Sequence, residues 1–172
     1  MTLNELNTLS ASAATDWFQQ TCAAQSWIYN MVNGRPFGTV NDVKEYAKTA
    51  WSKCGNEDFL EAFTAHPMIG DVDSLRKKFA NTKAIASGEQ SGTASASEAT
   101  LLTLKEANQA YLDKHGFIFI ICATGLSADA MLSALQERLP NSTDEEIRNA
   151  AQEQIKITLL RIDKALTAKD EH

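Results

Sequence analysis

HPMIGD, at residues 66–71, is the stretch that decides how this chain is organised. Pro67 fixes its own φ, has no N–H to donate and disfavours the α conformation at His66, so a helix must end here. Gly70 permits backbone conformations that other residues rarely adopt, and Asp71 or Asp73 can cap the helix expected to follow. The stretch therefore predicts a corner between two helices, with an imidazole at a helix end. Such a corner fits a purely structural His66 as well as a catalytic one.

The composition is that of one folded domain with an acidic surface. The 172 residues are 44% hydrophobic, which is enough to build a core without disulfides or a metal. The net charge is −6, from 22 acidic and 16 basic residues, and the basic residues form no block. These features argue against nucleic acid and against an anionic membrane as partners.

The cysteines and the N-terminus indicate a reducing compartment. Cys22, Cys54 and Cys122 are widely separated and lack the spacing of a disulfide framework or a zinc site. We therefore predict free thiols and no metal site. The first residues lack the pattern of a signal peptide, and no apolar run approaches the roughly 18 residues that a membrane-spanning helix needs. The expected location is the cytoplasm.

Apolar residues recur at helical spacing along most of the chain, with breakers between the periodic segments. We predict an all-α fold, a single domain of residues 1–172 built as a bundle of about eight helices. Thr39 or Asn41 can cap one helix, and Ser127 can cap another. In the last helix we expect an apolar stripe that faces the core, formed by Ile147, Ala151, Ile155, Leu159, Ile162 and Leu166.

FIFIIC, at residues 117–122, is the most apolar stretch of the chain. Its β-branched residues favour a strand, but no other segment alternates well enough to pair with it. We predict a buried crossing of the core that is extended or irregularly helical. Its backbone N–H and C=O groups then need partners elsewhere, and they could face a ligand.

Two further places carry candidate ligand-binding residues. Residues 83–97 are rich in Ala, Ser, Gly and Thr, which favours a linker. Within them, Glu89 places an acceptor beside the amide of Gln90, and this pair suits a ligand with amide edges. Arg161 lies off the apolar stripe of the last helix, and its planar fork either extends to solvent or points into a pocket.

Taken together, these stretches resemble the 2-oxo-4-hydroxy-4-carboxy-5-ureidoimidazoline (OHCU) decarboxylase family over nearly all 172 residues. The most specific are HPMIGD at 66–71 and the run from NQAY at 108–111 through GFIFIICATG at 116–125. One difference is a serine that the family is expected to carry three positions before the glutamate, where this chain has Ala86 and places Ser87 next. The remaining stretches are RPF at 35–37, EQ at 89–90, and EQIKI at 153–157 with Arg161.

The resemblance implies an all-α carboxy-lyase that needs no cofactor and commonly forms homodimers. Its reaction would convert OHCU to (S)-allantoin, with loss of CO₂, in the degradation of urate. The role of the histidine is open between contact with the departing carboxylate or hydroxyl and proton transfer. The predicted catalytic residues are His66 and Glu89, and the predicted substrate-binding residues are Pro67, Gln90, Phe119, Ile121 and Arg161.

Two alternative functions are compatible with the residues. In a non-catalytic helical interaction domain, residues 66–71 would be only a corner, residues 83–97 only a linker, and Arg161 a surface residue. An enzyme requires His66, Glu89 and Arg161 around one cavity, so their convergence discriminates the two. A hydrolase of a neighbouring ureide would use the same amide-reading residues.

Overall fold

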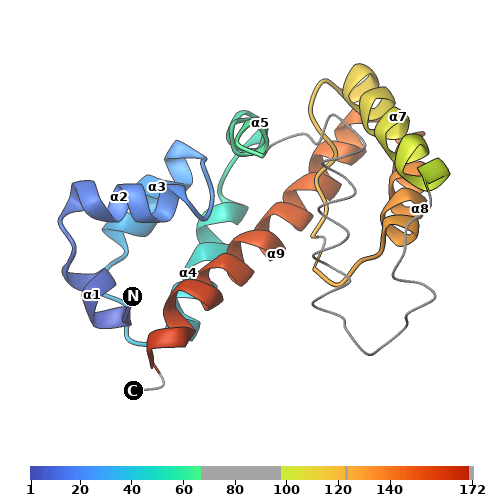
Figure 1. Ribbon diagram of the computed structural model, residues 1–172. Coiled ribbons are helices and arrows are strands. Elements are labelled where there is room, and N and C mark those ends of the chain that lie inside the picture. Colours follow the sequence, from blue (N-terminus) through green and yellow to red (C-terminus); the bar gives the residue numbers. More distant parts are fainter. Residues whose placement is uncertain (67–97, 123, 171–172) are drawn as a thin grey trace. The chain divides into compact units, whose positions relative to one another are not determined.

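The computed structural model describes residues 1–66, 98–122 and 124–170. Within these ranges the chain forms eight α-helices and no strand, which confirms the predicted all-α class (Figure 1). None of the described helices is both long enough and apolar enough to cross a bilayer. The helices are α1 (Leu3–Thr8), α2 (Ala11–Gln19), α3 (Gln25–Asn33), α4 (Val40–Ser52), α5 (Asn56–Thr64), α7 (Glu98–His115), α8 (Ala128–Arg138) and α9 (Thr143–Asp170).

The chain divides into two compact units. Unit 1 comprises residues 1–65 and 149–172, and unit 2 comprises residues 66–148. The long helix α9 contributes its first residues to unit 2 and the others to unit 1. That residues 1–172 form a single domain stays a prediction.

Side-chain caps begin several helices where the sequence indicates. Of the two candidates for α4, Thr39 is the cap, because its Oγ1 accepts a hydrogen bond from the Asp42 N–H at 3.0 Å. Ser127 caps α8 in the same way, by accepting from the Ala130 N–H at 3.1 Å. At the C-terminal end of α7, Gly116 has a φ of 82°, a conformation that ends helices and favours glycine.

Two buried tryptophans join the helices of unit 1. Nε1 of Trp27 on α3 donates to the carbonyl oxygen of Ala47 on α4 at 3.1 Å. Nε1 of Trp51 on α4 donates to the carbonyl oxygen of Ala151 on α9 at 2.9 Å. Each indole therefore fills the core while its one polar group is satisfied. As a result α4 lies beside the unit 1 part of α9 (Figure 1).

The RPF stretch at residues 35–37 has a structural role in unit 1. Nη1 of Arg35 donates to the carbonyl oxygens of Leu6 and Leu9, at 2.9 and 2.8 Å, at the end of α1. The backbone N–H and C=O of Phe37 both bond the side-chain amide of Asn7, at 2.8 and 2.9 Å. These contacts fasten α1 to the connection between α3 and α4.

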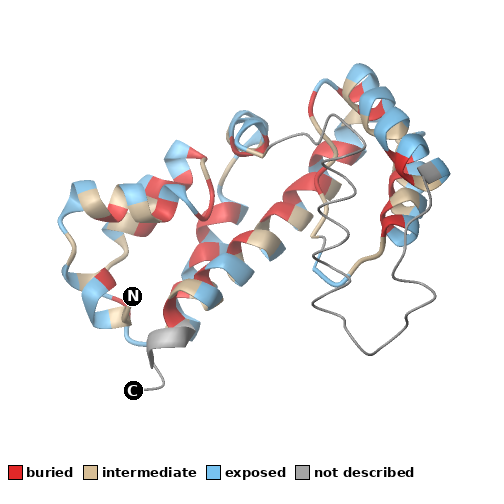
Figure 2. Cartoon of the chain, in the orientation of Figure 1, coloured by how far each residue is buried: buried red, intermediate tan, exposed pale blue. Residues whose placement is uncertain are grey.

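The predicted stripe of α9 is partly wrong. Ile147, Ala151, Ile162 and Leu166 are buried, but Ile155 and Leu159 are only half-buried. The polar residues Gln154 and Thr158 lie deeper, at 1% and 0% exposed. Figure 2 shows how buried and exposed residues alternate along the described part of α9. Their burial is possible because Nε2 of Gln154 donates to Oγ1 of Thr158 at 3.0 Å, and that hydroxyl donates to the Thr21 carbonyl at 3.1 Å.

In unit 2, α7 packs against α8, and residues 117–122 follow α7 as a segment that is neither helix nor strand. Phe117 and Ile120 are buried, whereas the other four residues of the stretch are half-buried. The prediction that the stretch is buried therefore holds for two of its six residues.

Candidate functional site

The predicted site residues fall into three groups. Pro67, Glu89 and Gln90 lie outside the described residues. His66, Phe119 and Ile121 belong to unit 2, and Arg161 belongs to unit 1. The convergence of these side chains on one cavity stays a prediction.

His66 lies where the sequence predicts, directly after a helix. α5 ends at Thr64, and the N–H of Ala65 still donates to the carbonyl of Ala62 at 3.2 Å. His66 follows in a bend and is half-buried. The imidazole is thus attached to backbone that leaves the helical conformation just before Pro67, as the restriction on a residue preceding proline requires.

Arg161 is exposed on α9 and contacts the end of α2. Its Nη1 lies 3.3 Å from the Thr21 carbonyl oxygen and 3.5 Å from that of Gln20. Carbonyls at a helix C-terminus carry partial negative charge, so a cation is favourable there. Within unit 1, Nε and Nη2 have no acceptor among the described residues. Nη1 of the planar guanidinium is therefore held by the protein, while Nε and Nη2 are placed to donate to a ligand.

Cys22 lies in the polar region beside Arg161. Its thiol contacts Thr158, the residue whose hydroxyl donates to the Thr21 carbonyl. Burial raises the pKa of Cys22 to about 11. A thiol with such a pKa is protonated near neutral pH, so Cys22 is unsuited to act as a nucleophile.

The 117–122 stretch is held by side chains from α7 and α8. Nη1 of Arg138 donates to the Ile120 carbonyl at 2.8 Å, and its guanidinium carbon lies 4.5 Å from the centre of the Phe119 ring. The ring of Tyr111 lies edge-on to that of Phe119, with centres 5.2 Å apart. At least one backbone carbonyl of the stretch thus has a side-chain partner, as expected for a segment outside a helix.

Glu146 connects these side chains in the interior of unit 2. Its Oε1 accepts from the Tyr111 hydroxyl at 2.6 Å and from Nε of Arg138 at 2.7 Å. Its Oε2 accepts from Nδ2 of Asn141 at 2.9 Å. Burial, and then the hydrogen bond to Glu146, raise the pKa of Tyr111. This group could not be predicted from the sequence, because Tyr111 fits an ordinary apolar face of α7, and Arg138 and Glu146 fit ordinary charges in a last and a first helical turn.

His115 joins α7 to the connection between α8 and α9. Its Nδ1 lies 2.9 Å from the Thr143 hydroxyl, and its Nε2 lies 3.3 Å from the Leu139 carbonyl. The ring is buried against Tyr111, with centres 4.5 Å apart. His115 is thus bound to its neighbours in unit 2 as a core residue.

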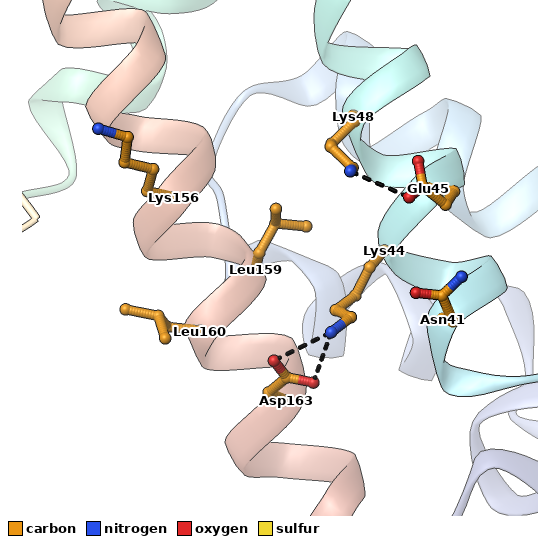
Figure 3. Close-up of a pocket in the computed structure, with 8 residues that line it drawn as sticks. All are labelled: Asn41, Lys44, Glu45, Lys48, Lys156, Leu159, Leu160 and Asp163. Atoms are coloured by element: carbon orange, nitrogen blue, oxygen red, sulfur yellow. Dashed lines mark hydrogen bonds and ion pairs between the residues drawn. The ribbon is translucent and has the colours of Figure 1, made fainter.

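A surface hollow of about 410 Å³ lies between α4 and α9 in unit 1, and it contains none of the predicted site residues (Figure 3). Lys44 points across it to Asp163, with nitrogen–oxygen distances of 3.2 Å. Lys48 pairs with Glu45 on its own helix at 3.0 Å. Because these ammonium groups already have carboxylate partners, the hollow is a poor match for an anionic ligand.

The described residues contain no group of three or more His, Cys, Asp or Glu side chains that could hold a metal ion. All three cysteines are free thiols.

Comparison with known proteins identifies relatives along most of the chain. The family model described as OHCU decarboxylase matches residues 7–163. A protein of Haloferax volcanii named 2-oxo-4-hydroxy-4-carboxy-5-ureidoimidazoline decarboxylase is 26% identical over 163 residues, which cover 94% of each chain. The uric acid degradation bifunctional protein TTL of Arabidopsis thaliana is 37% identical over 157 residues. That match covers 90% of this chain and 48% of the relative, so the chain spans about half the length of the plant protein.

Solved structures share the same fold. A crystal structure of OHCU decarboxylase in the presence of (S)-allantoin has a TM-score of 0.73 and 35% identity, and the match covers 88% of this chain and 98% of that one. A structure of (S)-allantoin synthase has a TM-score of 0.72 at 18% identity, and covers 96% of this chain and 54% of that one. At that identity the second likeness concerns the fold alone.

Proposed function

Because this chain belongs to the OHCU decarboxylase family, we propose that it is a carboxy-lyase that converts OHCU to (S)-allantoin in urate degradation. The observation that carries the proposal is the family match over residues 7–163. The relative from Haloferax volcanii supports it, because that decarboxylase and this chain align along 94% of both lengths.

The structure of OHCU explains how the reaction proceeds without a cofactor. Its carboxylate is attached to a carbon that also bears a hydroxyl and neighbours a C=N bond. When the bond to the carboxylate breaks and CO₂ leaves, the electron pair moves toward the imine nitrogen, which takes a proton. The resulting enol becomes a carbonyl as its hydroxyl proton is lost and a proton is added to the carbon that bears the ureido group. The substrate is thus its own electron sink, a part that a cofactor must otherwise supply.

Substrate recognition is assigned to residues that match amide and carbonyl edges. Arg161 offers Nε and Nη2, which have no acceptor among the described residues of unit 1, to carbonyl or ureido oxygens. Glu89 accepts from ureido N–H groups, and Gln90 both donates and accepts. The backbone of Phe119 and Ile121 on the half-buried stretch, together with Pro67, completes the proposed binding set.

His66 is assigned to the chemical step together with Glu89. An unperturbed imidazole titrates near neutral pH, so it can exchange protons with the hydroxyl or with the carbon that is protonated last. Delivery of that last proton from one side only gives a single enantiomer. His66 directly follows the end of α5 and is half-buried, and a side chain held at one place beside the substrate would suit such a directional task.

The proposal also covers the state of the protein in the cell. We assign one domain to residues 1–172 and a homodimer as the assembly, in the cytoplasm, as the family resemblance and the composition suggest. Light scattering coupled to size-exclusion chromatography would check the dimer by its mass. Fractionation of cells would check the location.

The proposed activity is tested with freshly generated OHCU, by measuring CO₂ release against a buffer control. We expect one CO₂ per OHCU consumed, at a rate proportional to protein concentration. Binding without accelerated CO₂ release would favour the interaction domain. Release of ammonia or urea in place of CO₂ would favour the ureide hydrolase.

A further inference from the structure

A buried carboxylate in unit 2 couples two side chains that hold the 117–122 stretch. One oxygen of Glu146, Oε1, accepts from the Tyr111 hydroxyl at 2.6 Å and from Nε of Arg138 at 2.7 Å. Because the same atom serves both donors, the phenol and the guanidinium cannot shift independently. Glu146 is 0% exposed, so bulk water does not compete for that oxygen.

Both donors also contact the stretch itself. Arg138 donates to the Ile120 carbonyl at 2.8 Å and covers the Phe119 ring at 4.5 Å from its centre. Tyr111 contacts the same Phe119 ring from α7, with centres 5.2 Å apart. Ile120 lies between Phe119 and Ile121, the two residues assigned to substrate binding. The contacts therefore fix the backbone between those two residues.

Stability alone does not account for an arginine at position 138. Its Nη2 is buried and has no hydrogen-bond partner among the described residues, which costs free energy. The presence of a buried ion pair is weak evidence that it stabilises the fold, because apolar residues of similar volume often replace such a pair without loss of stability. An apolar side chain, however, cannot hold a carbonyl and cover an aromatic ring together. What the guanidinium adds is a fixed position for the stretch.

We infer that Arg138 is a positioning residue for the decarboxylation, acting through Ile120 and Phe119 and oriented by Glu146 and Tyr111. The inference rests on the proposed function and on the predicted use of residues 117–122 in substrate binding. The network places the backbone groups of the stretch before OHCU arrives. Such preorganisation favours substrate binding, since the groups need not be ordered at that moment.

The test variant is Arg138→Lys, because lysine keeps the positive charge facing Glu146 but lacks the planar fork. Its matched control is Arg148→Lys, the same substitution at an exposed position of α9. We expect kcat/KM for OHCU to fall at least about tenfold in Arg138→Lys, mainly through KM, because uniform binding is lost. Amide hydrogen exchange across residues 118–121 should speed up in the same variant. Arg148→Lys should match the wild type in both measurements.

Tyr111→Phe is the second variant, and it decides the matter if Arg138→Lys does not fold. It keeps the ring against Phe119 and removes one donor to Glu146, so we expect a rise in KM of about threefold and faster exchange in the stretch. Wild-type KM and exchange in a folded Arg138→Lys protein, or in Tyr111→Phe if the first is unfolded, would overturn the inference and leave the proposed function intact. An inactive wild-type protein would instead contradict the proposed function, and the inference with it.

Discussion

Arg138 and Arg161 hold their guanidinium groups in opposite ways. In unit 2, Arg138 has a side chain only 14% exposed, and its Nε lies 2.7 Å from a fully buried carboxylate oxygen. In unit 1, Arg161 is exposed, and its Nη1 lies 3.3 Å from the nearest of two neutral carbonyl oxygens. A short charged bond in the interior resists displacement, whereas long bonds in contact with water yield readily.

The difference indicates two roles: Arg138 positions the 117–122 stretch of the protein, whereas Arg161 is available to a ligand. Arg138 uses Nε and Nη1 on protein acceptors, and its third nitrogen is buried. Arg161 uses one nitrogen within unit 1. We therefore expect changes at Arg138 and its partners to alter stability as well as substrate binding, and changes at Arg161 to alter binding with little effect on stability.

The largest expected effect is on stability, in Glu146→Gln. Removing the charge leaves the Arg138 guanidinium buried without its counter-ion, a change that costs about 3–5 kcal/mol in comparable pairs. We expect the lower end, because the arginine side chain keeps 14% exposure. Urea unfolding measures the loss, and Glu145→Gln, one residue earlier and exposed, is the control. An equal effect in both variants would contradict the special status of Glu146.

The second prediction concerns ligand binding, in Arg161→Lys. Loss of the planar fork should weaken binding of (S)-allantoin by about 1.5–3 kcal/mol, the scale of a hydrogen bond to a charged group. The free energy of unfolding should change by less than about 0.5 kcal/mol, as for most exposed sites. Calorimetric titration and urea unfolding measure the two quantities, with Arg148→Lys as control. Unchanged binding with reduced stability would reverse the comparison.

Tyr111→Phe should have a smaller effect on stability than Glu146→Gln. The phenol bonds to a carboxylate, so its removal should cost about 1.5 kcal/mol, while Arg138 and Asn141 continue to donate to Glu146. Thermal unfolding would detect this as a shift of roughly 3–6 °C, for a chain of this size. No shift would mean that the hydroxyl contributes nothing to the network.

The smallest expected effect is the pH dependence that Cys22 gives to unit 1. Its pKa is raised from 9.0 to about 11 in the folded protein, so the folded state favours the neutral thiol. The stabilisation is complete below pH 9 and is lost as the pH rises toward 11. Between about pH 8 and pH 10 it should decline by roughly 1 kcal/mol. The stability of Cys22→Ala should therefore fall less steeply over that range, and parallel profiles would contradict the assignment.

Local rules made much of the fold predictable from the sequence. Thr39 and Ser127 cap helices because a side-chain oxygen reaches an N–H three residues on, and Gly116 ends α7 because its φ is positive. The predicted apolar stripe of α9 was wrong at Ile155 and Leu159, which are only half-buried. Gln154 and Thr158 are buried instead, because their hydrogen bonds end on the carbonyl of Thr21 in a distant segment.

The candidate site was less predictable for the same reason. Residues from a recognised pattern, such as His66 and Arg161, could be proposed in advance. Tyr111, Arg138 and Glu146 could not, because they are far apart in the chain and form one network only after folding. Periodicity reports which residues share a helix face, and it carries no information on which polar atoms meet across helices.

The chirality of the allantoin formed from OHCU tests the central claim most directly. Without a catalyst, the last proton can reach either face of the planar carbon, so both enantiomers form. With the wild-type protein, circular dichroism of the product should show (S)-allantoin alone, formed faster than in buffer. In His66→Ala the rate should fall far more than product binding, because the residue is assigned to the chemical step. Racemic allantoin at the buffer rate in the presence of folded wild-type protein would contradict the account.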